Sequence, residues 1–362
     1  MNLTRRFFVT GAMATMLSRP VFGKELLSDR FGQCTVSAIP TSNVLAMEGW
    51  HVWNNSIIEI ADDKYVGFFD RWPSARGFRS WVTHGEICFA TASSPMGPFR
   101  FERQIIIRRD NAYWDAAAAY NPHVIVHGGK FYLFYTGNQG NEVWPDSIPD
   151  KLVDVDDDWW VHRNSQRVGV AVADSIHGDW IRQDDPIIPL PEGYRTTGTP
   201  NIVQRGGEIL LYFKAVKEKP GKVGGQVRHF VCSASDPLGP YGPAREISFV
   251  GQAKTRIPFD DHFEWWDGET FFAIVKDHDE KVMGGNRLLL FQSGDGQKWK
   301  LAKKPLLSRF QLMVEGRTNT KLKRFEMPKI LFDRDGTARV LSLAAWDGEG
   351  EAFNVAIDLV NC

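Results

Sequence analysis

Short apolar runs recur in pairs along the chain, and each pair is joined by a tight turn. Each paired segment has a polar or proline-marked start, an apolar strand, a turn, and a second strand rich in aromatic residues. The segments are 54–72, 120–137, 199–215, 261–277 and 326–343. Their turns lie at Asp63, Gly129, Gly207, Gly268 and Gly336, at intervals of roughly 60 to 80 residues. Turn dipeptides such as Asp-Gly and Gly-Gly are strong hairpin signals.

A second hairpin motif alternates with the first. It has a strand, a turn of small and polar residues, and an aromatic residue that begins the next strand. It occurs at 89–99, 170–180, 232–241 and, more loosely, 293–299. Two hairpins per unit make four strands, and a repeat of such units is typical of a propeller. The sequence therefore predicts an all-β fold, a five-bladed β-propeller of four-stranded blades around a central channel, with residues 26–362 as one domain. The alternative is a sandwich in which hairpins recur by chance.

The composition agrees with short strands and excludes several functions. The chain has 362 residues, with 13 Trp, 24 Phe and 8 Tyr beside 33 Gly and 19 Pro, which does not favour a helical bundle. Its 43 Lys and Arg residues balance 44 Asp and Glu residues. This balance argues against a nucleic-acid partner and against a polybasic membrane surface.

The first residues have the pattern of an export signal. Arg5 and Arg6 precede a weakly apolar run, Val9 to Leu17, which is too short to span a bilayer stably. We therefore expect residues 1–25 to be a twin-arginine signal that is removed, and the mature protein to be periplasmic or secreted. Cys34 and Cys362, near the two ends of the mature chain, could form a disulfide that closes the ring; buried free thiols are the alternative.

In a propeller the first strand of each blade lines the channel, so the residues that open the first motifs should meet at one mouth. Four carboxylates lie at such positions: Glu48, Asp115, Asp261 and Glu326. Two carboxylates in one poorly solvated site can supply a proton donor and a proton acceptor at the same pH. Glycoside hydrolysis needs such a pair, about 6.5–9.5 Å apart for inversion or about 5 Å for retention. Each carboxylate could instead cap a hairpin or form a salt bridge.

Two further features suit a carbohydrate partner. Trp53, Trp114 and Trp265 lie near these openings, and their rings could stack on the C–H faces of sugars. The insertion 138–164 carries tryptophans beside a run of aspartates and should overhang the mouth. It is either a substrate lid or a solvated turn.

Several segments resemble one group of enzymes. The stretches WHVWNNSIIEIADDKY, YNPHVIVHGGKFYLFYTG and FEMPKILFDRDGTARVL, with the turns ASSPMGPF and ASDPLGPYG, are similar to five-bladed glycoside hydrolases of family 43, related to families 32 and 117. The resemblance covers about residues 45–345. It implies an enzyme that cleaves a glycosidic bond in an oligosaccharide, or in a fragment of plant or algal polysaccharide, by inverting carboxylate catalysis; the predicted signal implies that this enzyme is exported.

The chain departs from the pattern of these families in two blades. An aspartate usually opens blade one as the base or nucleophile, and another in blade two tunes a pKa, but here Asn54 and Asn121 stand at those places. The familiar set of residues therefore cannot be copied across. We expect Asp115 or Glu48 to activate water and Asp261 or Glu326 to protonate the leaving group. Because family 117-like sites can use a histidine as acid, His51 and His123 are further candidates.

Substrate binding is predicted for eight residues around the same mouth: His51, Trp53, Asn54, Arg71, Asn121, His123, Trp265 and Arg317. Of these, Arg71 and Arg317 would hold hydroxyls or a uronate, and Trp53 would form a platform for the sugar. We expect no required cofactor, although His, Asp and Asn side chains near the axis could hold a structural Ca²⁺.

Two other functions fit the same scaffold. A ring that binds oligosaccharide without cleaving it would explain the missing aspartate of blade one. A polysaccharide lyase would use a Tyr/His pair in place of two carboxylates. The fold cannot decide between these functions, because chemistry depends on the site.

Overall fold

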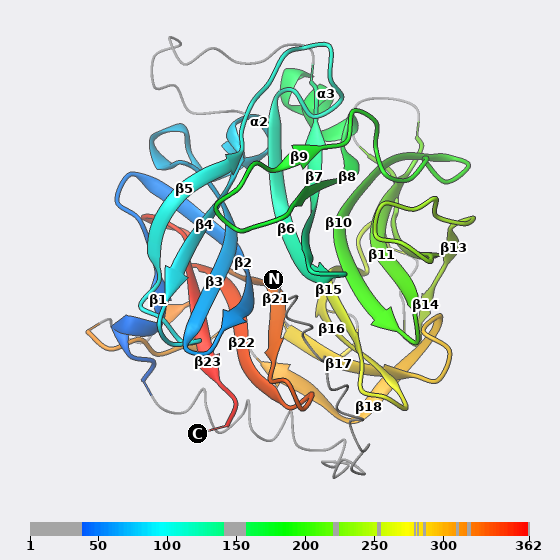
Figure 1. Ribbon diagram of the computed structural model, residues 1–362. Coiled ribbons are helices and arrows are strands. Elements are labelled where there is room, and N and C mark those ends of the chain that lie inside the picture. Colours follow the sequence, from blue (N-terminus) through cyan, green and yellow to red (C-terminus); the bar gives the residue numbers. More distant parts are fainter. Residues whose placement is uncertain are drawn as a thin grey trace, which may run out of the picture.

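Five antiparallel sheets stand side by side around a central axis and form a five-bladed β-propeller, as the repeats predict (Figure 1). In this computed structural model the described residues are 38–140, 157–219, 224–251, 255–278, 280, 282–284, 287–308, 311–316 and 320–360. The predicted signal, Cys34, Cys362, Arg317 and most of the insertion after Asn138 lie outside these ranges.

The first four blades follow the order of the chain. Blade one is β2 (Trp50–Ala61), β3 (Lys64–Pro73), β4 (Glu86–Ala92) and β5 (Arg100–Ile106). Blade two is β6 (Ala118–His127), β7 (Lys130–Asn138), β8 (Arg167–Ala173) and β9 (Ile181–Arg182). Blade three is β10 (Tyr194–Arg205), β11 (Glu208–Lys217), β12 (Val227–Ala234) and β13 (Arg245–Glu246). Blade four is β15 (Phe259–Trp266), β16 (Phe271–Asp277), β17 (Arg287–Ser293) and β18 (Lys298–Ser308), to which β14 (Ser248–Phe249) adds in parallel.

The fifth blade joins the two ends of the ring. It contains β21 (Arg324–Phe332), β22 (Ala338–Trp346) and β23 (Phe353–Asp358), and its outermost strand is β1 (Val44–Leu45) from the start of the described chain. Val44 pairs with Val355 and Leu45 with Asn354 in an antiparallel ladder. Strand pairing therefore closes the ring, whatever the state of the two terminal cysteines.

The predicted turns and inner strands are confirmed. Asp63, Gly129, Gly207, Gly268 and Gly336 all adopt positive φ in the connections between the first two strands of each blade. The inner strands β2, β6, β10, β15 and β21 are neighbours around the axis. Because these strands begin at one end of the ring, the loops that precede them define a single mouth.

The core lies between blades, where aromatic and aliphatic side chains of facing sheets meet. Phe68 and Phe89 of blade one, for example, share a buried cluster with Leu133 and Tyr135 of blade two. Equivalent clusters join blades two and three, three and four, and four and five. This packing holds each inner strand against the next, which is the requirement for residues of different blades to form one site.

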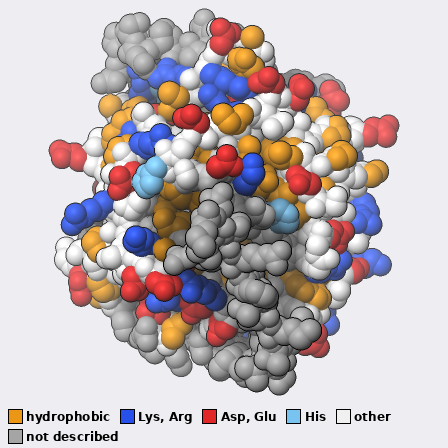
Figure 2. Space-filling view, viewed as in Figure 1, with side chains coloured by type: hydrophobic (Ala, Val, Ile, Leu, Met, Phe, Trp, Pro, Cys, Tyr) orange, Lys and Arg blue, Asp and Glu red, His pale blue; other side chains and the backbone are white. Residues whose placement is uncertain are grey.

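Several short elements lie outside the sheets of the five blades. They are the 3-10 turns η1 (Thr41–Asn43), η2 (Ser74–Arg76) and η3 (Phe78–Ser80), the helices α2 (Trp81–His84) and α3 (Asp157–Asn164), and the strands β19 (Gln311–Leu312) and β20 (Thr320–Lys321). Acidic and basic side chains are interspersed over the face shown in Figure 2. In the described ranges, no helix combines the length and the apolar character needed to cross a membrane.

Candidate active site

Each inner strand is interrupted by a bulge near the mouth. One non-glycine residue per bulge has a left-handed backbone conformation: Asn54, Asn121, Thr199, Asp261 and Met327, with φ between 42° and 57°. The strand ladders shift register at these same five places. A bulge re-aims the side chains beside it, and such conformations are uncommon for residues with a side chain. Five equivalent bulges therefore direct a ring of side chains toward the mouth.

The second strand of a blade supports the bulge of the next blade. Asp70 accepts the backbone N–H of Asn121 at 3.1 Å, and Thr136 Oγ1 accepts that of Thr199 at 2.8 Å. The corresponding residues of blades three and four are Lys214 and Lys276. These lysines bind carboxylates in place of backbone groups. The supporting side chains are therefore hydrogen-bond acceptors in blades one and two and cations in blades three and four.

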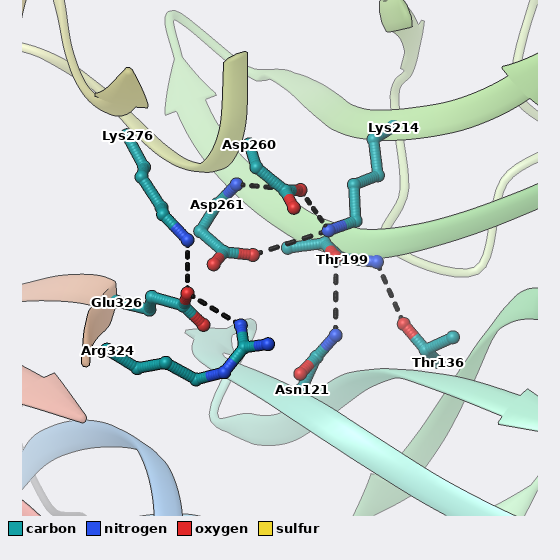
Figure 3. Close-up of polar contacts among 9 residues, drawn as sticks. All are labelled: Asn121, Thr136, Thr199, Lys214, Asp260, Asp261, Lys276, Arg324 and Glu326. Atoms are coloured by element: carbon teal, nitrogen blue, oxygen red, sulfur yellow. Dashed lines mark hydrogen bonds and ion pairs between the residues drawn. The ribbon is translucent and has the colours of Figure 1, made fainter. Parts of the chain in front are cut away.

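Three carboxylates meet these two lysines, as Figure 3 shows. Lys214 Nζ forms an ion pair with Asp260 and lies 3.3 Å from Asp261 Oδ1. Lys276 Nζ forms an ion pair with Glu326, whose Oε1 also accepts from Arg324 Nη1 at 2.9 Å. We call these six residues the mouth cluster: Lys214, Asp260, Asp261, Lys276, Arg324 and Glu326.

The carboxylates of the mouth cluster are held in different ionisation states. Burial and the neighbouring charge of Asp260 raise the pKa of Asp261 to about 6. Burial also opposes ionisation of Asp260 and Glu326, but the adjacent lysines outweigh it and hold the pKa of both carboxyls below the usual range. A carboxyl that keeps its proton up to about pH 6 thus lies beside carboxylates that have already lost theirs, which is the condition for acid/base catalysis.

Neutral hydrogen-bonding groups complete the group drawn in Figure 3. Asn121 Nδ2 donates to Thr199 Oγ1 at 3.2 Å, which links the bulges of blades two and three. The side chains of Asp260 and Arg324 keep 20% and 37% of their exposure, whereas Glu326 and Lys276 keep 6% and 5%. A ligand would therefore approach past Asp260 and Arg324.

Of the predicted carboxylates, the structure brings together Asp261 and Glu326 and does not bring Asp115 to them. The carboxylate of Asp115 has no exposed surface. Arg109 binds one of its oxygens, while Arg182 and the hydroxyl of Tyr135 contact the other at 3.3 and 2.7 Å. With no surface open to solvent or substrate, Asp115 has a structural placement between blades one and two. Glu48 is exposed, in the turn before β2.

Three predicted binding residues of blade one lie in its packing. His51 is buried against Trp72 and accepts the N–H of Ala352 at 3.0 Å, and burial lowers its pKa to about 4 even though Glu351 acts in the opposite sense. Trp53 is buried edge-on to Phe78. Arg71 pairs with Glu86 at 2.7 Å and lies over the rings of Trp50 and Phe101. None of these contacts joins them to the mouth cluster.

The remaining predicted residues are divided between the channel, the mouth and the core. Asn54 is buried and donates to the carbonyl of Pro122 at 2.9 Å. His123 lies 3.3 Å from Lys329 Nζ, and burial holds its pKa well below the usual range. Asn121 is part of the mouth, as described above. Trp265 packs on Phe272 in the core of blades four and five. Arg317 lies outside the described residues.

No group of three or more His, Cys, Asp or Glu side chains arranged to hold a metal ion occurs in the described part of the chain. The ammonium of Lys329 is buried beside His123 in the inner-strand layer. The Ca²⁺ site remains a prediction without assigned ligands.

Of the four cysteines, Cys88 and Cys232 are buried free thiols.

Four residues of the mouth cluster were not among the predicted site residues: Lys214, Asp260, Lys276 and Arg324. A signal for the lysines does exist. Lys214 and Lys276 each interrupt an apolar second strand, in YFKAV and AIVKD. A lysine in a buried strand requires a partner charge. Asp260 is adjacent to the predicted Asp261, whereas nothing local distinguishes Arg324 from other arginines.

Comparison with known proteins relates the chain to propeller enzymes by fold. No family model matches the chain, and no curated protein matches it. Among solved structures, a family 117 glycoside hydrolase of the marine bacterium Zobellia galactanivorans is 19% identical, with a TM-score of 0.54 over 86% of this chain and 85% of that one. An endo-arabinase of Bacteroides thetaiotaomicron is 13% identical, with a TM-score of 0.57 over 85% and 94%. A family 43 β-xylosidase/α-arabinofuranosidase from a compost metagenome is 12% identical, with a TM-score of 0.59 over 89% and 94%.

Proposed function

We propose that this protein is a glycoside hydrolase whose reaction takes place at the mouth cluster. Asp261 is the general acid that protonates the leaving oxygen, and Glu326 is the ionised carboxylate that activates water. The observation that carries the proposal is the pairing, in one recessed group, of a carboxyl with a raised pKa and a carboxylate with a lowered one. The similar structures named above are glycoside hydrolases, which supports the same reaction class.

The substrate in this proposal is an oligosaccharide or a fragment of plant or algal polysaccharide, cleaved with inversion. In an inverting reaction the base acts on water on the opposite side of the sugar from the acid. Asp261 and Glu326 belong to the bulges of adjacent blades, and Lys276 contacts Glu326 from the blade of Asp261. A sugar held between the two bulges would have one carboxyl group on either side.

The test is turnover of purified wild type and three variants on a panel of aryl glycosides and oligosaccharides, with reducing-end release followed by chromatography. Asp261→Asn and Glu326→Gln are each expected to lower kcat by about 10²–10⁴-fold, the range for loss of one acid/base group. The matched control is Asp174→Asn, because Asp174 is an exposed carboxylate that pairs only with Lys130 in the described structure. Near-wild-type rates in both mouth variants, with circular dichroism unchanged, would refute the assignment.

A carbohydrate-binding ring without catalysis is the second candidate function. It is favoured by one observation: the bulges of blades one and two present Asn54 and Asn121, and neither residue can exchange a proton with a sugar. In the same panel, a sugar that raises the Tm of the wild type without being cleaved would support this function. Release of an unsaturated product that absorbs ultraviolet light would instead identify a lyase.

A further inference from the structure

Helix α3 is anchored to the rim of the mouth by residues on one of its sides. Trp159 Nε1 donates to the carbonyl of Arg79 at 3.0 Å, and its ring meets Trp81 edge-on. His162 Nδ1 donates to Asn138 Oδ1 at 2.9 Å. Trp160 and Arg163 are three residues apart, so they share a different side of the helix. A helix fixed in this way presents Arg163 in a defined position.

Arg163 lies within electrostatic range of the mouth cluster, but none of the described carboxylates pairs with it. Its electrostatic neighbours include Asp260 and Asp261, yet both of these carboxylates bind Lys214 instead. Within the described ranges its guanidinium makes no hydrogen bond or ion pair, and its one ring contact is Trp81 at 5.6 Å. Burial lowers the pKa of Arg163, as expected for a cation that has lost water without gaining a bound anion.

Arg256, in the segment before β15, lies beside the same helix α3. The positive charge of Arg256 contributes to the lowered pKa of Arg163, and its guanidinium lies 5.9 Å from the ring of Trp160. Its side chain makes no hydrogen bond or ion pair among the residues that the structure describes. Two like charges repel each other, so their convergence costs free energy unless an anion lies near both.

The arginines and the mouth cluster together include more cations than carboxylates. The five cations are Arg163, Arg256, Lys214, Lys276 and Arg324, and the three carboxylates are Asp260, Asp261 and Glu326. The surplus increases when Asp261 holds its proton. A neutral sugar would leave this surplus uncompensated.

We propose that the mouth recognises an anionic saccharide, with a carboxylate or sulfate group of the sugar bound between Arg163 and Arg256. This inference rests on the proposed function, because it assumes that the mouth takes a carbohydrate. The planar fork of a guanidinium matches both carboxylate and sulfate oxygens and can bind them through two parallel hydrogen bonds. Trp160, half-buried beside Arg256, supplies an apolar surface for the sugar ring next to its charge.

The test is binding, measured by calorimetry on the Asp261→Asn protein so that no probe is consumed. One pair of probes is trigalacturonate and its carboxyl-reduced neutral form; the other is a sulfated galactan tetrasaccharide and its desulfated form. We expect the charged member of one pair to bind about tenfold or more tightly than its neutral counterpart, the value of one charge-assisted contact. The pair that shows the preference identifies the anion as carboxylate or sulfate.

Variants of the two arginines test whether these residues cause the preference for a charged probe. Arg163→Gln and Arg256→Gln are each expected to reduce it to less than about threefold while leaving neutral-sugar affinity unchanged. Arg334→Gln is the matched control, because Arg334 is an exposed arginine in the turn after β21, at the far end of the blade, bound to Glu59 and Asp62. If Arg163→Gln does not fold, Arg163→Lys keeps the charge and removes the fork, and is expected to lose most of the preference.

Equal affinity for charged and neutral probes in both pairs would overturn the inference, as would a preference that survives in both glutamine variants. The outcome is separable from that of the proposed function. Tight binding of a charged probe by a wild type that cleaves nothing would retain the inference and reject the hydrolase. Cleavage of neutral sugars without any charge preference would do the reverse.

Discussion

Two adjacent aspartates in the fourth blade have opposite ionisation behaviour. Asp260 faces Lys214 directly, and its carboxylate also accepts the backbone N–H of Asp261 at 3.1 Å. Asp261 is more deeply buried and has the negative charge of Asp260 beside it, so its pKa is raised to about 6. Lys214 therefore stabilises the ionised form of Asp260, and the negative charge of Asp260 in turn favours the protonated form of Asp261.

This coupling predicts the pH dependence of catalysis. A general acid works only when protonated, so kcat/KM should fall as pH rises through about 6, the pKa of Asp261. Asp260→Asn removes the negative charge that raises this pKa and leaves Lys214 free to bind Asp261. Both changes favour the ionised form, so the falling limb should move to lower pH. A pH–rate profile of the variant that matches wild type would contradict this coupling.

Lys276 is expected to matter for stability as well as for chemistry. It and Glu326 are both almost fully buried, and removal of Lys276 leaves the carboxylate with the more exposed Arg324 as its ion-pair partner. Lys276→Met should lower the free energy of unfolding by up to about 3–5 kcal/mol, the cost of breaking a buried pair, and it should raise the pKa of Glu326. Urea denaturation measures the first effect. The double variant Lys276→Met, Glu326→Leu should recover most of the loss, and a single variant as stable as wild type would exclude a significant buried pair.

At the scale of elements, four of the five bulges are paired with a polar side chain from the second strand of the preceding blade. In the first two blades the support is an acceptor, Asp70 or Thr136, for a backbone N–H. In the next two it is a lysine for a carboxylate. The backbone geometry is thus repeated around the ring, while the chemistry is confined to one side of it.

Strand β1 is the element whose loss should affect the whole ring. Leu45 is buried with Val52 and Phe69 of blade one while its backbone pairs with β23 of blade five. Leu45→Ala should therefore lower the free energy of unfolding by about 2–5 kcal/mol, as for other buried leucines. Val126→Ala, an exposed strand position, is the control and should change it by less than about 0.5 kcal/mol. Equal denaturation midpoints for the two variants would show that the closure contributes little.

At the scale of the molecule, the ring brings together groups that are far apart in the chain. Asn121 of blade two and Glu326 of blade five are separated by two blades in sequence but open on the same mouth (Figure 3). The five cations and three carboxylates counted above contrast with the near-neutral chain, whose formal net charge is −1. Local charge at the site, not the overall charge, determines which ligand is attracted.

Export also belongs to the whole molecule, and we propose that the paired arginines direct it. Replacement of both Arg5 and Arg6 by lysine keeps the charge but removes the paired arginines that define this signal. In a bacterial host with a twin-arginine pathway, the variant should accumulate in the cytoplasm while wild type reaches the periplasm. Cell fractionation and immunoblotting measure the distribution. Unchanged periplasmic yield of the variant would reject this signal.

The fold could be read from the chain because its information is local. Turn residues at Asp63, Gly129, Gly207, Gly268 and Gly336 each specify a hairpin within a few residues, and repetition of that hairpin specifies a propeller. Asp261 and Glu326 could also be placed at the mouth, because both open a first strand. These inferences need only the order of residues and the geometry of a blade.

The partners of each side chain were decided by packing between blades. Asp115 has the same position before a first strand as the other candidates, but Arg109 and Arg182 enclose it. Lys214 and Lys276 are ordinary strand lysines until the ring places them against carboxylates of the following blade. Such contacts join residues about 50 positions apart, with intervals of 46 and 50 for these two pairs. A linear pattern specifies which face of a strand a residue occupies, but the charge that meets it there depends on the closed ring.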